Sequence, residues 1–172
     1  FGGSSHRIYG NHFGVDLAGS NAMAGGVLVA NAASVQIGGS DPAERNVFAN
    51  LSAPGDVAVG GVNVGEDSSG VVIINNYFGT EPNGVTDAPI EHAIVSDADD
   101  GRISQNLMNN ATEWALILRS TAERNTVDQN RVGLPVFCIG ACSNAQANTR
   151  GYLIEGSFND LWLNRVAFSL SN

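Results

Sequence analysis

The densest group of acidic side chains in the sequence is SDADDGR, at positions 96 to 102. Carboxylate oxygens are the ligands that calcium prefers, which makes Asp97, Asp99 and Asp100 candidate ligands of that ion. Their spacing lacks the EF-hand pattern, and Asp-Asp-Gly is also common in turns between strands. Calcium is therefore the candidate cofactor. The alternative is that this segment is an ordinary solvated turn.

The other charged candidates for catalysis are Asp128, Arg131 and Glu155. Hydrolysis of a glycosidic bond needs two carboxyl groups about 5 to 9.5 Å apart, which act as acid and base or as acid and nucleophile. Asp128 and Arg131 could form a small polar site, although an ordinary surface ion pair is favoured. Glu155 stands alone at an expected strand end, which favours a solvated charge. The catalytic hypothesis is that these residues form a site together with Asp97 and Asp99.

Three ring-bearing side chains, Tyr77, His12 and Trp162, are the candidate binding residues. Each lies within two positions of an asparagine that recurs along the chain, so the sequence groups them at similar places. Aromatic side chains at such places could stack on sugar rings. The alternative is that loops, such as the one containing DPAER, cover them.

Two cysteines, Cys138 and Cys142, lie in a loop at about positions 134 to 150. There is no further cysteine, and the histidines are remote in sequence, so the pair is a poor zinc signature. A disulfide that closes the loop is one interpretation, and two free thiols in a reducing compartment are the other. Neither interpretation implies catalysis.

A short pattern recurs along the chain and must position all these side chains. It consists of an aliphatic residue, two positions of any type, an asparagine, one position of any type and an apolar residue, as in Ile73, Asn76 and Phe78. The copy at Val47 is weaker at its last position. The asparagines of the six copies are Asn11, Asn50, Asn76, Asn106, Asn130 and Asn164.

A second set of short apolar segments lies upstream of most of these asparagines. Strands that recur once per coil predict parallel strands stacked coil on coil, and we expect about six coils. By propensity alone, NNATEWALILRSTAERN could form a helix, but its place in the repeat predicts a strand. The segments are GVLV at 26 to 29, GVNV at 61 to 64, HAIV at 92 to 95, WALI at 114 to 117 and GYLI at 151 to 154.

The repeated asparagine has a physical role in such a stack. Asparagine tolerates the left-handed turn conformation, and at the same corner of every coil its amide can bond to the asparagines above and below. These bonds would satisfy the buried backbone of the turn. The repeat therefore predicts an internal asparagine ladder.

Two of the repeated phrases resemble those of a known family. VQIGGSDPAERNVFAN and VVIINNYFGTEPNG are similar to the Ile-Gly-Gly…Arg-Asn-Val and Asn-Tyr-Phe-Gly-Thr repeats of bacterial right-handed parallel β-helix proteins of the pectin-lyase-like superfamily. The resemblance covers most of residues 5 to 133 and returns at 151 to 168. It implies an all-β, right-handed parallel β-helix. Because the superfamily contains polysaccharide lyases, some of which use calcium, as well as hydrolases, epimerases and adhesins, it leaves the function open.

The middle residue of each upstream strand is expected to point out of the coil, and four of these residues are aliphatic: Leu28, Ile94, Leu116 and Leu153. Exposed together, they would form a large apolar patch on the surface. A solenoid also exposes unpaired strand edges at its ends. Both features predict a homo-oligomer with these four residues at the interface.

Length and charge limit the remaining possibilities. The 172 residues fit one domain, at 1 to 172, and the opening FGGSS leads us to expect a processed or trimmed piece of a longer chain. A net charge of −9 without any lysine opposes binding to nucleic acid or to an anionic membrane surface, and equips the chain poorly for a lyase acting on a polyanion. No apolar run approaches the roughly 18 residues of a membrane span.

Two functional hypotheses follow. The leading one is a non-catalytic, extracellular or cell-surface β-helical module that binds a glycan or a protein. The alternative is a carbohydrate-active enzyme, a lyase, hydrolase or epimerase. Two or more carboxylates that converge in a groove with a basic residue would favour the enzyme, and smooth apolar outer sheets would favour the module.

Overall fold

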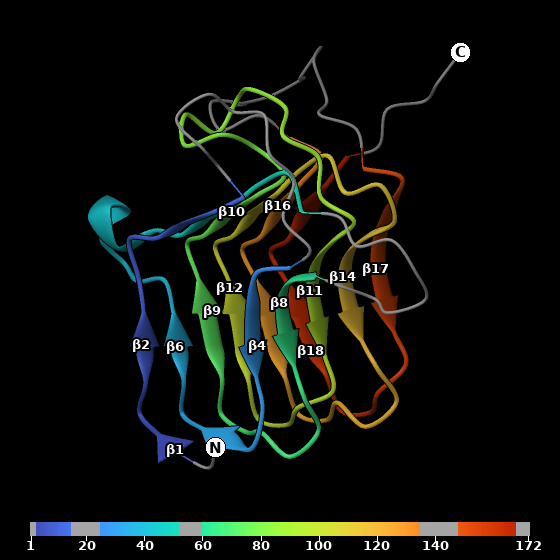
Figure 1. The fold of residues 1–172 in the computed structure, drawn as a ribbon. Helices are drawn as coiled ribbons and strands as arrows, with labels where there is room; N and C mark the ends of the chain where they lie inside the picture. The colour runs from blue at the N-terminus through green and yellow to red at the C-terminus, as the bar shows by residue number, and fades with distance from the viewer. Residues whose placement is uncertain (1–2, 15–24, 52–59, 135–147, 168–172) are drawn as a thin grey trace.

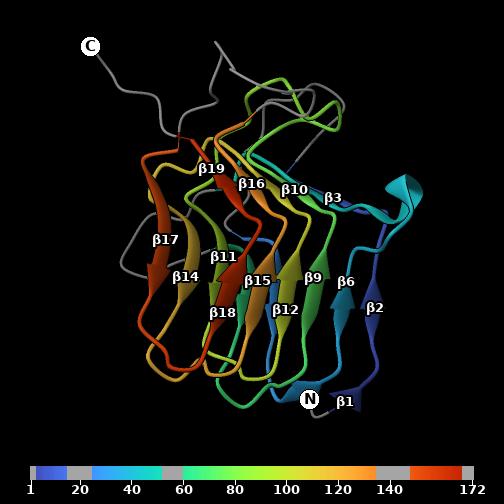
Figure 2. The ribbon, with the colours of Figure 1, turned by 180° about the vertical axis from the view of Figure 1, so that it is seen from behind.

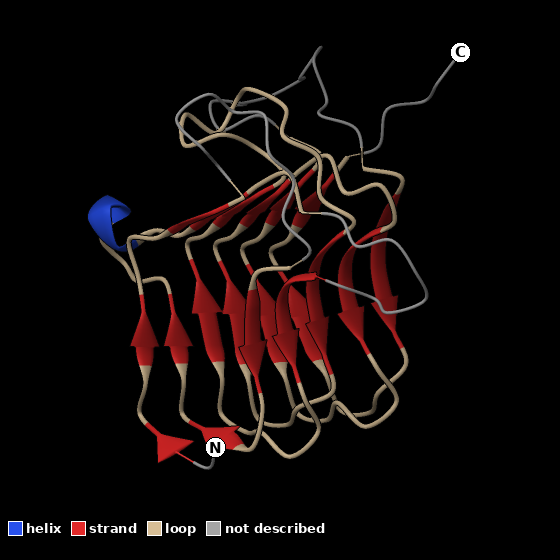
Figure 3. Ribbon diagram, in the orientation of Figure 1, coloured by secondary structure: helices blue, strands red, loops and turns tan. Residues whose placement is uncertain are grey.

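The computed structural model of the 172-residue chain describes residues 3–14, 25–51, 60–134 and 148–167. The predicted disulfide between Cys138 and Cys142 lies outside these residues. Within them, strands stack in parallel into three long sheets, and the one helical element is a short 3-10 turn, η1 (Pro42–Glu44) (Figure 3). No helix in this part of the chain is long and apolar enough to cross a membrane.

Each of the three sheets takes one strand from successive coils (Figure 1). The front sheet contains β4 (Val27–Val29), β8 (Gly60–Val64), β11 (His92–Ser96), β14 (Trp114–Leu118) and β17 (Arg150–Ile154). The back sheet contains β2 (Arg7–Ile8), β6 (Gln36–Ile37), β9 (Val72–Ile74), β12 (Arg102–Ser104), β15 (Thr126–Asp128) and β18 (Asp160–Trp162). The upper sheet contains β3 (His12–Phe13), β7 (Val47–Phe48), β10 (Tyr77–Phe78), β13 (Leu107–Met108), β16 (Arg131–Val132) and β19 (Arg165–Val166). A separate pair joins β1 (Gly3–Ser4) to β5 (Ala32–Ala33).

The predicted fold class is confirmed. In Figure 1 the chain runs down the front sheet and up the back sheet as it advances from left to right, and Figure 2 agrees from behind, so the β-helix is right-handed. The predicted count of about six coils is slightly high, because five described coils supply all three sheets and the coil of β2 and β3 supplies only two. The segment that could have been a helix contains strand β14 and no helix, as the repeat predicts.

The predicted asparagine ladder is present, with one correction. The second asparagine of the ladder, counted from the N-terminus, is Asn46 and not Asn50. The other five are the asparagines that the repeat predicts. The reason is the DPAER excursion, which inserts η1 between β6 and Asn46 and so interrupts the expected spacing. Asn50 instead has a positive φ of 50° after β7. The Nδ2-to-Oδ1 distances along the ladder are 3.1 Å (Asn11 to Asn46), 2.9 Å (Asn46 to Asn76), 3.1 Å (Asn76 to Asn106), 3.1 Å (Asn106 to Asn130) and 3.0 Å (Asn130 to Asn164).

The left-handed residue of this corner is not the ladder asparagine itself, contrary to our expectation. In most coils it is the residue immediately before, as at Asn75, Gln105 and Gln129, with φ values of 56°, 57° and 57°. That residue directly follows the back-sheet strand, and the side-chain amide of the asparagine after it forms the ladder hydrogen bonds. At this corner the side chains of Gln105 and Gln129 are exposed, and that of Asn75 is half-buried.

The core fills the lumen of the helix. Phe13, Phe48 and Phe78 stack on successive rungs with ring centroids 4.7 and 4.8 Å apart, and Met108 and Val132 continue that column. Stacking of like side chains on every rung leaves few gaps between coils, which is what a close-packed interior requires.

The front sheet shows a second correction. Ile94 and Leu116, expected on the outside, are 0 % exposed and belong to the core, so they are not interface residues. In the strand register, Leu28 pairs with Asn63, Asn63 with Val95, and Ile117 with Leu153. Side chains alternate between the faces of a strand, so a shift of one residue reverses the side on which each lies. Leu28 remains outside at 73 % exposed, and Leu153 is half-buried.

Candidate functional site

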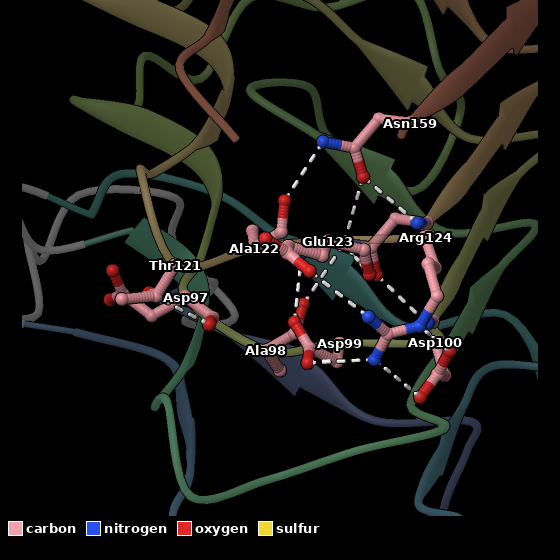
Figure 4. A network of polar contacts seen from close by, with 11 residues as sticks. Asp97, Ala98, Asp99, Asp100, Thr121, Ala122, Glu123, Arg124 and Asn159 are labelled. Carbon is pink, nitrogen blue, oxygen red and sulfur yellow. Dashed lines mark hydrogen bonds and ion pairs between the residues drawn. The ribbon is translucent and has the colours of Figure 1, made fainter. Parts of the chain in front are cut away.

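The acidic cluster is held by arginine. Arg124 donates to Asp99 at 2.9 Å and to both oxygens of Asp100 at 2.8 and 3.1 Å, and it also contacts Glu123 (Figure 4). Hydrogen bonds from Arg124 lower the pKa of Asp100. Asp97 lies apart from this pair, 4.0 Å from Arg119.

Calcium does not fit this arrangement, because the guanidinium of Arg124 bonds the oxygens that would have to coordinate the ion. Among the described residues, no group of three or more His, Cys, Asp or Glu side chains could hold a metal ion. The cluster therefore works as a set of ion pairs between two neighbouring coils.

Asp128 has a different partner from the one expected. It is fully buried, and both of its oxygens accept bonds from Arg102, each at 2.9 Å, while Gln129 donates to one of them at 2.9 Å. The bonds from Arg102 lower the pKa of Asp128 in spite of its burial. Arg102 lies on β12, one rung from Asp128, so the pair ties two coils of the back sheet together. A carboxylate bonded in this way is poorly placed to exchange protons with a substrate.

Glu155 is exposed just beyond β17, on the front sheet, whereas Asp128 belongs to the back sheet. Neither of them lines a described cleft with another candidate carboxylate. In the described part of the chain these residues thus do not lie together. The hypothesis that they form a catalytic site is not supported.

The three ring-bearing candidates are spread over the molecule. His12 is exposed on β3, and Trp162 is 46 % exposed on β18 of the last described coil. Tyr77 is only 9 % exposed, because the guanidinium of Arg45 lies over its ring, 4.0 Å from the centroid. Of the three, Tyr77 alone lines a described pocket.

That pocket is the candidate functional site, and we call it the Arg45–Arg131 pocket. It has a volume of about 200 Å³ at the corner between the back and upper sheets. Arg45 reaches it from the end of the DPAER excursion and is fixed by Asn75, whose carbonyl and Oδ1 accept bonds of 3.2 and 2.9 Å. The lining residues are Arg45, Asn75, Tyr77, Gln105, Leu107 and Arg131.

The fold explains how these residues meet. Asn75 and Gln105 are the left-handed residues that precede the ladder, so their side chains lie at the same corner on successive coils. Tyr77, Leu107 and Arg131 form one column on successive rungs of the upper sheet, and this column continues to Arg165. Rungs are about 4.8 Å apart, so these five side chains, together with Arg45 from the preceding coil, line one small volume.

The pocket is electropositive although the whole chain carries a charge of −9. Arg131 and Arg165 lie on neighbouring rungs of this column, and burial, followed by the charge of Arg165, lowers the pKa of Arg131. The sequence analysis named Tyr77 as a binding candidate and Arg131 as a catalytic candidate, but it did not place them in one site and did not identify Arg45 or Gln105. Arg45 directly precedes the ladder asparagine Asn46, and this position could have identified it. The sequence analysis assigned that ladder position to Asn50 and so missed Arg45.

A second cleft, of about 390 Å³, lies on the outer face of the front sheet. Its lining includes Leu28, Asn63, Val95 and the Asp97–Arg119 pair. This cleft contains one carboxylate, so it does not offer the two that glycoside hydrolysis needs.

Comparisons of the chain with protein-family models, with curated proteins and with solved structures found no match. The functional argument therefore depends on the geometry of the chain's own residues.

Proposed function

We propose that this chain is a non-catalytic β-helical module that binds a glycan with acidic sugar units at the Arg45–Arg131 pocket. The observation that carries the proposal is the convergence of two guanidinium groups, two side-chain amides and a tyrosine on one pocket. We further propose that the module acts outside the cell or at its surface, where such glycans are accessible.

The chemistry of the pocket suits an acidic sugar better than a neutral one. A guanidinium group can donate two parallel hydrogen bonds to one carboxylate, and charge-assisted bonds of this kind are about twice as strong as neutral ones. The amide of Gln105 can both donate and accept, as sugar hydroxyls require, whereas the amide of Asn75 already bonds Arg45 and Gly39 and holds the guanidinium in place. The volume of about 200 Å³ is that of a single sugar unit or its substituent, not of a polymer segment.

Binding without catalysis is supported by the composition of the same pocket. Among the described residues that line it, none carries a carboxylate or an imidazole. Those are the side chains that most often transfer protons in catalysis. Arginine remains protonated at physiological pH and serves to hold an anion.

Isothermal titration calorimetry with matched oligosaccharides tests the proposal. A uronic-acid oligosaccharide should bind more tightly than the neutral oligosaccharide of the same linkage. Arg131→Gln should weaken binding of the acidic sugar about tenfold or more, since a hydrogen bond to a charged group contributes about 1.5–3 kcal/mol. Binding of the neutral sugar should change little.

The matched control is Arg150→Gln, which removes an arginine that pairs with Glu113 at 2.7 Å on the front sheet. This variant should bind the acidic sugar like the wild type. Equal affinity for the two sugars, or equal losses in the two variants, would contradict the proposal. Release of new reducing ends during a long incubation would instead favour the enzyme.

A further inference from the structure

The cleft of about 390 Å³ on the outer face of the front sheet, which we call the front-sheet cleft, has no role in the proposed function. Leu28 and Val95 lie two rungs apart in its lining, and Leu28 is 73 % exposed. Between them, the amide of Asn63 is bonded to the backbone of Gly60. Pockets for small molecules typically measure about 300–1,000 Å³ and are mainly apolar, with a few placed polar groups. The front-sheet cleft has this size and character.

A column of residues with alternating charge runs beside the apolar part of the cleft. Its members directly follow the strands β8, β11, β14 and β17, and their backbone N–H groups continue the hydrogen bonding of the sheet. In the order of the rungs they are Gly65, Asp97, Arg119 and Glu155. Asp97 therefore has a cation on one neighbouring rung and a residue without a side chain on the other.

The carboxylate of Asp97 is weakly paired. Its ion pair with Arg119 spans 4.0 Å, whereas charge-assisted hydrogen bonds to a carboxylate are about 2.7–2.9 Å long. Thr121 donates at 3.0 Å to the backbone oxygen of Asp97 and not to the carboxylate (Figure 4). Among the residues that the structure describes, no group donates a hydrogen bond to this carboxylate, although the side chain is only 30 % exposed. A carboxylate with unused acceptor sites thus lines the cleft.

There is space for a ligand group at Gly65, on the rung next to Asp97. Gly65 also lines the cleft, and a Cβ there would have one close neighbour, the backbone oxygen of Val29 at 3.6 Å. A positive group at this place would continue the alternation of charge along the column. An anion is less suited to the cleft, because Arg119 already has a carboxylate on each neighbouring rung, Asp97 and Glu155.

From these features we propose that the front-sheet cleft binds a small organic ammonium ion with an aliphatic body. The ammonium group lies over Gly65 and donates hydrogen bonds to the carboxylate of Asp97. The aliphatic body contacts Leu28 and Val95 and removes apolar surface from water. This site is separate from the Arg45–Arg131 pocket, whose two arginines suit an anion, so either site can be tested without the other.

An NMR titration of the isotope-labelled chain at neutral pH with hexylamine, hexanol and hexanoate tests the proposal. The three probes have the same chain length, and hexylamine is protonated at this pH, as a lysine side chain is. Hexylamine should shift the backbone amide signals of Gly65 and Asp97. It should bind about tenfold or more tightly than hexanol, because its hydrogen bonds join two charged groups. Hexanoate should bind most weakly, since its carboxylate would face Asp97.

Two substitutions locate the site. Asp97→Asn should remove the preference for hexylamine over hexanol and leave the binding of hexanol nearly unchanged. Gly65→Lys should place a covalent ammonium group in the cleft and abolish the binding of hexylamine. The matched control is Asp160→Asn, which removes an exposed carboxylate from the back sheet and changes the net charge as Asp97→Asn does. Asp160→Asn should bind hexylamine like the wild type.

Several results would overturn the proposal. Equal affinities of the wild type for hexylamine and hexanol, or no binding of hexylamine, would do so without any variant. Equal losses in Asp97→Asn and Asp160→Asn would show attraction by net charge alone. Signals of the cleft that shift with protein concentration in the absence of a probe would show that a second copy covers the cleft, which also overturns the proposal.

Discussion

Asp128 is the clearest case of a residue whose role depends on its partner. Isolated buried carboxylates are strongly disfavoured, and the side chain is 0 % exposed, but two bonds from Arg102 on the neighbouring rung compensate its charge. The same residue type at Asp99 and Asp100 stays near the surface with Arg124. Both sets of bonds join neighbouring coils, and they differ chiefly in burial.

Asp128→Asn should therefore destabilise the chain by about 2 kcal/mol, since it removes a buried charge-assisted pair and leaves Arg102 with a weaker acceptor. Asp100→Asn is the control, because it removes a carboxylate that bonds Arg124 at the surface, and its loss should be smaller. Guanidinium unfolding at neutral pH measures both. Equal losses in the two variants would show that burial of Asp128 has no energetic weight.

The same pair predicts a pH dependence. Bonds from Arg102 hold the pKa of Asp128 below its unfolded value. A carboxyl group with a lowered folded pKa contributes stability above the unfolded pKa, about 3.9, and loses it as the pH falls through the folded pKa. The difference in unfolding free energy between the wild type and Asp128→Asn should thus be largest at neutral pH and shrink below about pH 4. A difference that is constant from neutral to acidic pH would contradict this origin.

At the scale of elements, the corners of each coil hold the strands in register. The ladder asparagines satisfy buried backbone groups from two coils at once, as Asn106 does through Asn76, Asn130 and the carbonyl of Ile73. Strands of two or three residues have few ladder bonds of their own. The hydrogen bonds at the corners therefore supply much of the stabilisation of the strand register that longer strands provide in other β folds.

Asn106→Ala should cost about 3 kcal/mol or more, because the backbone N–H of Asn76 would remain buried without a partner and the amide bonds to Ile73 and Asn130 would be lost. Asn83→Ala, on an exposed loop where the amide bonds Thr86, is the control and should cost less than about 1 kcal/mol. Chemical unfolding of both variants checks the expectation. A loss at Asn106 no larger than that at Asn83 would rule out a structural role for the ladder.

The second corner, after the upper sheet, is equally restricted. Gly79 has a φ of 72°, and a Cβ there would collide with the backbone oxygen of Asn109 on the next coil. Gly79→Ala should therefore prevent close stacking and lower the thermal midpoint strongly. Gly65→Ala is its control, because its nearest neighbour is the Val29 oxygen at 3.6 Å, so its midpoint should change little. Similar midpoints for the two variants would contradict the assignment.

At the scale of the whole molecule, stacking of coils builds surfaces that no single coil contains. The Arg45–Arg131 pocket draws its residues from four coils, and its two arginines stand out against a chain of net charge −9.

The sequence by itself determined the parallel β-helix and most of the asparagine ladder. This was possible because each coil repeats a local pattern and contacts only its neighbours, so Asn76, Asn106 and Asn130 could be aligned without knowledge of the rest. The strand at Trp114–Leu118 was predictable for the same reason, in spite of its helical propensity.

Only the tertiary structure decided which side chains meet. The register of β11 and β14 placed Ile94 and Leu116 in the lumen, because a shift of one residue reverses the face of a strand. Because of the DPAER excursion, the second asparagine of the ladder is Asn46, and the guanidinium of Arg45 lies over the ring of Tyr77. Asp128 paired with Arg102 and not with Arg131, since the nearest side chains in a solenoid belong to the next rung and not to the next positions in the chain.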